Sequence, residues 1–386
     1  MNEKIFSSYP ERISWNGTQS RREVLRMAGA ACLVLGGMSC AGMTRAGMVE
    51  PVGKSAAGGL TAAEREVLRL ASLAPSGHNT QPWTVRVVGK GRWVIGFDAA
   101  RALPAVDPGN RELLLSLGAF LENLVLAAGA MGMRAEYSVM AGKPHDRDVL
   151  EVRLEEDRKS QDRTGTIIAR RTIRKGMLMR EIASADLASL CGKDSSAIFL
   201  SHGSAGAEWI AGSTMEANRA QAYRNEAQEE LANWIRWRDA DVMKHRNGLT
   251  PAGMEIDGIA GWFVRHFYDR GSVLEKDFRE RTVDLVAGQV REGGGWIVMT
   301  SRDSTVPELV ETGRRFQRLL LGARERMIAV HPMTQALEEA PWRTEAARAI
   351  GADGSVQFIL RVGYVTRYPD PVSPRMPVEW FVTSSS

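Results

Sequence analysis

The chain has 386 residues, of which 44% are hydrophobic and 25% are charged, a composition typical of a globular protein long enough for two domains. Its net charge is +4, but the first 46 residues carry six Lys or Arg against three Asp or Glu. The remainder is almost neutral, with 44 basic and 43 acidic residues. This balance argues against a nucleic-acid partner and an anionic-membrane surface, which both need clustered positive charge. Only Cys191 follows the first 46 residues and the six histidines are scattered, so we expect no disulfide and no metal site.

Residues 1–46 have the pattern of an export signal. Arg21 and Arg22 lie shortly before a run of 13 apolar and small residues at 27–39, which is too short to span a bilayer. A pair of arginines before such a run is typical of twin-arginine signals, so we expect export through the Tat translocon to the periplasm or another extracytoplasmic compartment. The alternative is an amphipathic tail with chance arginines. Cys40 is a candidate for a lipid anchor, although the residues before it match a lipobox poorly.

After a linker at 47–59, the next hundred residues predict helices and strands in succession. Thr61 and Glu64 form a capping-box pattern at the start of a helix that we expect to run to about Ala74. Runs of alternating or continuous apolar residues predict four strands, and a long segment that is apolar on most sides predicts a central helix. The strands are expected at 83–88, 92–97, 134–140 and 149–156, and the central helix at 110–133.

A repeat relates the two halves of the chain. The strand-like segment 92–97 (RWVIGF) has a counterpart at 295–300 (GWIVMT). Residues of the central helix recur in a second helix at a constant offset of 195 positions: Gly118, Leu124, Leu126 and Ala128 correspond to Gly313, Leu319, Leu321 and Ala323. Either the chain contains a duplication, or two apolar helices preceded by strands are alike by coincidence.

Residues 224–271 have no counterpart in the first half and read as an insertion. We expect a first helix that carries Leu231, Trp234 and Trp237, then a segment marked by Gly and Pro, and then an aromatic helix at 261–268 (GWFVRHFY). Such an insertion is either a lid or interface, or an extra helical hairpin packed on the core.

Two polar segments have the composition of ligand sites. The connection at 75–82 (PSGHNTQP), between the first helix and the first strand, holds more hydrogen-bonding residues than a turn requires. Residues 170–174 (RRTIR) place Arg170 and Arg174 on one face if they are helical, with Thr172 near them. Two guanidinium groups and a hydroxyl suit a phosphate, whereas the alternative is a solvated basic surface.

Arg375 is a third candidate, because Pro374 and Pro377 restrict the backbone around it. The chain has no G-x-G-x-x-G or P-loop pattern, so a phosphate-bearing ligand would be held by scattered groups. No Ser-His-Asp set or pair of carboxylates stands out, and we assign no catalytic side chain.

Four motifs together resemble the nitroreductase superfamily of FMN-dependent flavoproteins. They are APSGHNTQPW at 74–83, RRTIR at 170–174, HPMTQ at 331–335 and SPR at 373–375, and their order makes the resemblance specific. The Acg-type branch, in which two nitroreductase-like halves are fused, is the more similar one. The resemblance implies an α+β fold with a mixed, largely antiparallel sheet flanked by helices. It also implies that this unit is built twice, at 60–160 and 161–382, as an intrachain pseudo-dimer.

The resemblance further implies which residues bind FMN. The loop of the first half would contact the flavin and ribityl group, the arginines of the second half would bind the phosphate, and backbone N–H groups of the segment from Pro332 would lie near flavin N5 and O4. The expected binding residues are Ser76, Asn79, Gln81, Arg170, Arg171, Thr172, Arg174, Met333, Thr334 and Arg375. Since each half lacks the other's elements, we expect one composite site and one FMN per chain. Family members commonly have an acidic residue where this chain has Thr334.

The implied function is an exported FMN oxidoreductase that passes electrons from a reduced donor, such as NAD(P)H, to a nitro, quinone or related small acceptor. The cofactor carries out such chemistry, and the protein orients it. In this interpretation the aromatic residues of the insertion cover the flavin. One alternative is a protein that sequesters or stores FMN with little turnover. Another is a flavin-free structural or interaction domain on a decayed flavoprotein scaffold.

Overall fold

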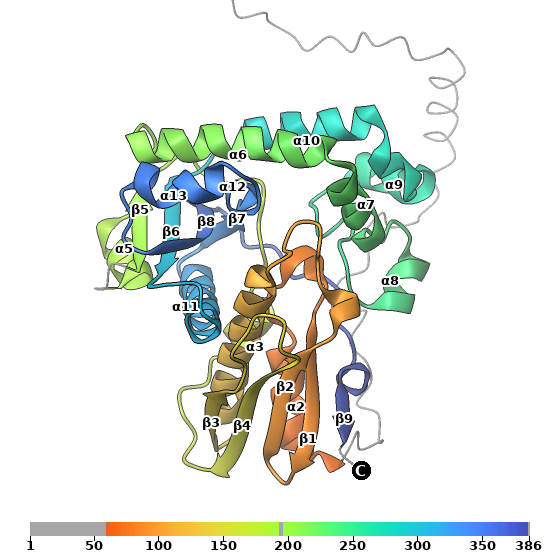
Figure 1. Cartoon of the computed structure of the whole chain (residues 1–386), viewed down its shortest axis with the longest axis vertical. Helices are drawn as coiled ribbons and strands as arrows, with labels where there is room; N and C mark the ends of the chain where they lie inside the picture. Colours follow the sequence, from red (N-terminus) through yellow and green to blue (C-terminus); the bar gives the residue numbers. More distant parts are fainter. Residues whose placement is uncertain (1–58, 193–195, 385–386) are drawn as a thin grey trace, which may run out of the picture. The chain divides into compact units, whose positions relative to one another are not determined.

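The computed structural model describes residues 59–192 and 196–384 as a mixed α+β structure with two sheets flanked by helices (Figure 1). This agrees with the expected α+β fold class. The predicted export signal, with Arg21, Arg22 and Cys40, lies outside the described residues, as does almost all of the predicted linker.

The first sheet has the strand order β3-β4-β2-β1-β9. Its strands are β1 (Trp83–Gly89), β2 (Arg92–Phe97), β3 (Met133–Val139), β4 (Asp148–Glu156) and β9 (Val382–Ser384). The first four pair antiparallel and match the predicted strands to within one residue at each end, whereas β9 adds parallel to β1. The end of the chain therefore joins the sheet of the first half.

The second sheet repeats this order. Its strands are β5 (Ala197–Leu200), β6 (Gly295–Ser301), β7 (Ile328–Pro332) and β8 (Ser355–Tyr364). Its order, β5-β6-β8-β7, corresponds to β1-β2-β4-β3 of the first sheet, because β5 to β8 follow one another along the chain as β1 to β4 do. All its pairings are antiparallel. The segments 92–97 and 295–300, which we matched by sequence, form β2 and β6 and so hold equivalent places in the two sheets.

A long helix follows the second strand of each sheet: α3 (Arg111–Ala130) follows β2, and α11 (Val306–Glu325) follows β6. By length and composition α3 is apolar enough to cross a membrane, but most of it is buried in the protein, as in a core helix. Both helices contribute to one large apolar cluster that includes side chains of both sheets.

The two long helices touch at their backbones. A Cβ atom added to Gly118 would lie 2.0 Å from the Val310 carbonyl oxygen, and one added to Gly313 would lie 2.0 Å from that of Leu115. The two contacts are equivalent, because Leu115 and Val310 are also 195 positions apart. Only glycine allows so close an approach, which explains why this residue type recurs at both positions.

Shorter helices complete the structure. They are α2 (Ala62–Ala71), α4 (Thr164–Ala169), α5 (Ser184–Cys191), α6 (Ala205–Tyr223), α7 (Asn225–Trp234), α8 (Asp239–His245), α9 (Gly258–Phe267), α10 (Lys276–Gln289), α12 (Gln335–Glu338) and α13 (Trp342–Ile350). The capping box of Thr61 and Glu64 is present, but α2 ends at Ala71, three residues before the expected end. Apolar residues of α6 pack against Trp296 and Val298 on one face of the second sheet.

The insertion forms a small core of its own. It includes Ile235, Trp237 and Val264, with Tyr268 and Phe278 packed against it. The expectation that Trp237 belongs to the first helix is wrong. The helix α7 ends at Trp234, where the backbone becomes extended and Ile235 forms a bridge with Leu249.

Candidate functional site

A cavity of about 350 Å³ lies where the two halves and the insertion meet, and its volume is within the range of small-molecule pockets. Segments that are far apart in the sequence line it together: the loop after α2, the start of α3, residues 170–174, residues 248–253, the end of β7 with α12, and residues 373–375. Of the predicted FMN-binding residues, the cavity is lined by Ser76, Asn79, Arg170, Arg171, Thr172, Arg174, Thr334 and Arg375.

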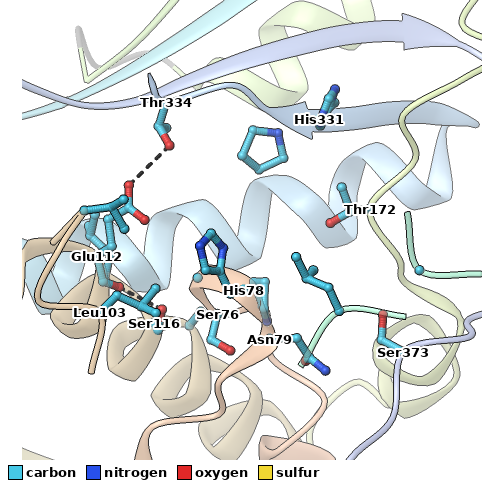
Figure 2. Close-up of a pocket in the computed structure, with 18 of the residues that line it drawn as sticks. Ser76, His78, Asn79, Leu103, Glu112, Ser116, Thr172, His331, Thr334 and Ser373 are labelled. Carbon is cyan, nitrogen blue, oxygen red and sulfur yellow. Dashed lines mark hydrogen bonds between the residues drawn. The ribbon is translucent and has the colours of Figure 1, made fainter. Parts of the chain in front are cut away.

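The loop after α2 enters the cavity in a constrained conformation. His78, Asn79 and Gln81 have φ values of 45°, 54° and 53°, in the left-handed region that non-glycine residues seldom adopt. Ser76 Oγ accepts a hydrogen bond of 3.0 Å from the backbone N–H of Gln81 across the turn. Figure 2 shows Ser76, His78 and Asn79 along one wall of the cavity. The polar residues of this loop thus stabilise its turn and also line the cavity.

Asn79 connects three parts of the chain. Its Nδ2 donates to the carbonyl oxygens of Gly248 (3.0 Å) and Pro374 (3.3 Å), and its Oδ1 accepts from Arg375 (2.8 Å). Its carbonyl oxygen accepts from the backbone N–H of Gly248 at 3.0 Å. The side chain therefore holds the insertion and the C-terminal segment against the loop.

Gln81 differs from Ser76 and Asn79, because its side chain is fully buried and does not line the cavity. Gln81 Nε2 donates to the Arg246 carbonyl oxygen at 2.9 Å, and its Oε1 accepts from the backbone N–H of Met376 at 2.9 Å. These hydrogen bonds join the loop to the insertion and the C-terminal segment, as those of Asn79 do.

Removing the Asn79 amide is expected to loosen the insertion. Asn79→Ala deletes three hydrogen bonds in or near the protein interior, each worth about 1 kcal/mol, so we expect unfolding free energy to fall by about 2–3 kcal/mol. Limited proteolysis should cut sooner near Arg246. The exposed Asn225→Ala is the matched control and should change stability by less than about 0.5 kcal/mol. Equal stability of the two variants would contradict the connecting role of Asn79.

Four arginines of the predicted phosphate clamp line the cavity, but residues 170–174 do not form a helical face. The helix α4 ends at Ala169, and Arg170 has an extended backbone. Arg170 is 3% exposed, and it donates to the Leu73 carbonyl oxygen at 2.9 Å. Its Nε atom is buried and has no hydrogen-bond partner in the part of the chain that the structure describes. Burial lowers the pKa of Arg170 to about 10.

The neighbouring arginines are held by the insertion. Arg174 Nη1 donates to the Gly253 carbonyl oxygen at 2.7 Å, and burial lowers the pKa of its guanidinium. Arg171 forms a buried ion pair of 3.1 Å with Glu255, which also accepts from the backbone N–H of Arg174 at 2.9 Å. Burying several guanidinium groups next to one carboxylate is costly unless an anion joins them. This end of the cavity therefore suits an anionic ligand group.

The segment at 332–334 fits the prediction only in part. Met333 is fully buried in the core, does not line the cavity, and donates its backbone N–H to the Ile359 carbonyl oxygen at 2.9 Å. In the structure this N–H continues the pairing beside β8. Thr334 does line the cavity, and Figure 2 shows its hydroxyl directed toward Glu112.

Three acidic residues that the sequence analysis missed lie around the end of the cavity near Thr334, away from the arginines. Glu112 and Glu338 line the cavity, and Asp107 lies close to Glu112. Burial and the negative charge of Glu112 raise the pKa of Glu338 to about 8 and that of Asp107 to about 7. Figure 2 shows Glu112 and Thr334 on one side and Thr172 and Ser373 on the other. The cavity thus has a cationic end and an acidic end.

The remaining lining is mostly apolar. Phe316 of α11 and Phe358 of β8 stack with their ring centroids 4.0 Å apart, and Leu115 and Ala119 of α3 line the same cavity. His331 also lines it, and burial together with the positive charges of Arg174 and Arg361 lowers the pKa of this imidazole well below 6.5. No sequence spacing links these groups, because two halves of the chain supply them.

The aromatic residues of the insertion do not line the cavity, contrary to our expectation. The lining residues that the insertion supplies are Gly248, Leu249, Thr250 and Gly253. The aromatic residues Trp234, Trp237, Trp262, Phe263 and Phe267 are absent from the lining, and several of them contact one another. Trp237 packs in the apolar cluster of the insertion, Trp234 packs against Leu103 and Val106, and Phe267 is 61% exposed.

No protein-family model matches the chain, but named proteins match it over most of its length. The "Putative NAD(P)H nitroreductase Rv3131" of Mycobacterium tuberculosis is 28% identical over 320 residues, which cover 80% of this chain and 87% of the relative. The "Putative NAD(P)H nitroreductase acg" of the same organism is 25% identical over 82% of this chain and 93% of the relative. The "Probable NAD(P)H nitroreductase PigM" of a Serratia species is 23% identical over 78% of this chain and 87% of the relative.

This chain is a distant homologue of these NAD(P)H nitroreductases. The matches extend over 319 to 330 residues, which is most of this chain and most of each relative. The predicted resemblance is confirmed at this level.

Proposed function

We propose that this chain binds one FMN in the cavity and passes electrons from NAD(P)H or another reduced donor to a nitro, quinone or related acceptor. The observation that carries this proposal is that the polar loop of the first half and the arginines of the second half line one cavity. The names of the distant relatives support the reaction class. FMN would supply hydride and electron transfer, and the protein would bind and orient it.

The lining residues fit this cofactor. Arg170, with its unpartnered Nε, would hold the phosphate together with Arg174 and Arg375, aided by the hydroxyls of Thr172 and Ser373. Phe316, Phe358, Leu115 and Ala119 provide an apolar wall suited to a flat ring system. Ser76 and Thr334 offer hydroxyl groups for the polar atoms of that ring.

We also infer that the halves at 60–160 and 161–382 form an intrachain pseudo-dimer, with 224–271 inserted in the second. The identical strand orders and the equivalent contacts of Gly118 and Gly313 support it. The first half has no arginine segment equivalent to 170–174, and the second has no loop equivalent to 75–82. One FMN per chain follows from this asymmetry.

The segment 246–255 favours a second candidate, an FMN-sequestering protein with little turnover. It is bonded to the first half through Asn79 and Gln81, and to the second half through Arg171 and Arg174. Such ties restrict access to the cavity and would slow the entry of a nicotinamide.

The absorption spectrum of the purified chain tests the proposal. We expect a flavin spectrum with one FMN per chain, bleached on addition of NADPH and restored by a quinone. A flavin that is present but bleaches only with dithionite would favour sequestration. A colourless protein that takes up no added FMN would contradict both candidates.

Export by the twin-arginine route remains part of the proposal, and it suits a protein that acquires a non-covalent cofactor before translocation. Changing both Arg21 and Arg22 to Lys is expected to retain the protein in the cytoplasm, because that route depends on the arginine pair. Cell fractionation with immunoblotting measures this, and Arg12→Lys is the matched control. Unchanged arrival outside the cytoplasmic membrane would show that another signal is used.

A further inference from the structure

At the acidic end of the cavity, one hydroxyl lies between two carboxyl groups. Thr334 Oγ1 is 3.2 Å from Glu112 Oε1 and 3.0 Å from Glu338 Oε1. A hydroxyl has a single proton and can donate it fully to only one of these oxygens. Both contacts are satisfied together when one carboxyl group is protonated and donates to the Thr334 oxygen.

The surroundings identify Glu338 as the protonated group. It is half-buried, and its other oxygen accepts from Gln221 Nε2 at 2.6 Å. Glu112 instead has a cation beside it, because Arg111 Nη2 donates to its Oε1 at 2.8 Å. Burial and the nearby Glu112 charge raise the pKa of Glu338 to about 8, so its carboxyl group keeps its proton at neutral pH.

The charged and titratable groups around this set come from several elements. They are Arg111 and Glu112 of α3, Asp107 before it, His78 of the loop after α2, Glu339 at the end of α12, and Arg224, which pairs with Glu339. The set faces the same cavity that Arg170 lines, and this arginine is 3% exposed with an Nε that has no partner among the described residues.

We propose that Glu338, Thr334 and Glu112 form a proton relay that delivers a proton to the acceptor in the cavity. This inference rests on the proposed function and deepens it. Reducing a quinone to a quinol takes two electrons and two protons, and the hydride from the reduced donor carries both electrons and one proton. For the second proton, the Glu338 O–H bond breaks as Thr334 accepts its proton and gives its own to Glu112, which protonates the acceptor oxygen. Solvent then reprotonates Glu338.

The first arm of the test measures folding and needs no turnover. A carboxyl group whose pKa is raised on folding stabilises the protein at low pH. For Glu338 this contribution is lost as the pH rises from 4.5, the pKa of the carboxyl group in the unfolded chain, through about 8, its pKa in the folded protein. We expect the melting temperature of the purified chain, with or without flavin, to fall over this interval, and to fall less steeply in Glu338→Gln. Glu226→Gln, at an exposed position of α7, should keep the wild-type profile.

The second arm measures quinone reduction with NADPH as donor, at equal flavin content. Thr334→Val removes the hydroxyl at nearly constant volume and should lower kcat by about 100-fold, the lower part of the range for a positioned proton donor. Thr334→Ser restores the hydroxyl and should recover most of that loss. Glu338→Gln should lower kcat similarly and abolish the decline of the wild-type rate above about pH 8.

The outcomes separate the relay from the function on which it rests. Unchanged stability and kcat profiles in Glu338→Gln, with flavin bound and turnover present, would overturn the relay and leave the proposed function intact. Equal rates in Thr334→Val and Thr334→Ser would overturn it too. A chain that binds no flavin would contradict the proposed function and the delivery step, whereas the melting profile would still decide whether Glu338 carries the proton.

Discussion

Arg174→Glu is expected to yield a folded protein that has lost nearly all its flavin. The guanidinium lines the cationic end of the cavity and is held there by the Gly253 carbonyl oxygen. A charge-assisted hydrogen bond to phosphate is worth about 1.5–3 kcal/mol, and the substituted carboxylate adds repulsion, so affinity for FMN should fall by more than about 100-fold. Flavin absorbance per chain after purification measures the loss, and circular dichroism reports the fold.

The charge reversal needs a control of the same kind away from the cavity. Arg219→Glu, on the exposed side of α6, changes the net charge equally and should retain full flavin content. Asn79→Ala should weaken FMN binding less than Arg174→Glu, because it removes hydrogen bonds without placing a negative charge in the cavity. If Arg174→Glu remains fully yellow, the phosphate clamp is assigned wrongly.

Gly118→Ala is expected to destabilise the fold by about 3 kcal/mol or more, the upper part of the range for overpacking. The added Cβ would lie 2.0 Å from the Val310 carbonyl oxygen and 2.9 Å from the Gly313 Cα, which are both backbone atoms that no rotamer change can move. The helices α3 and α11 must therefore separate along the contact that joins the two halves. Chemical denaturation followed by circular dichroism measures the change.

Gly212→Ala is the matched control, since it lies inside α6 and its added Cβ would meet no atom within 4 Å. There the substitution should stabilise the protein by about 0.5–1 kcal/mol, because alanine favours the helix over glycine. The double variant Gly118→Ala and Gly313→Ala should lose less unfolding free energy than the two single variants together, since one separation of the helices relieves both clashes. Equal effects of Gly118→Ala and Gly212→Ala would contradict the close contact.

The features predicted well from the sequence are those set by local pattern. Alternating and continuous apolar runs located β1 to β4 of the first sheet but not β9, and the capping box at Thr61 located the start of α2. The offset of 195 positions matched two helices whose glycines are in contact. These signals depend on residues close in sequence, or on the repetition of one pattern.

The features that the sequence describes least well depend on distant parts of the chain. Gln81 resembles a ligand contact, but its partners are backbone groups of Arg246 and Met376, more than 160 residues away. Met333 lies in the correct motif, yet strand pairing takes its N–H. Glu112 and Glu338 were not singled out by any sequence pattern, and they come within reach of one hydroxyl only where distant parts of the chain approach each other. No sequence spacing encodes that approach.

The central claim is that this cavity recognises a flavin through its phosphate. Calorimetric titration of the flavin-stripped chain with FMN, and separately with riboflavin, which lacks the phosphate, tests it most directly. We expect one FMN per chain and at least about 100-fold weaker binding of riboflavin, since several charge-assisted bonds would be absent. Equal affinities for FMN and riboflavin, or two FMN molecules per chain, would contradict the account.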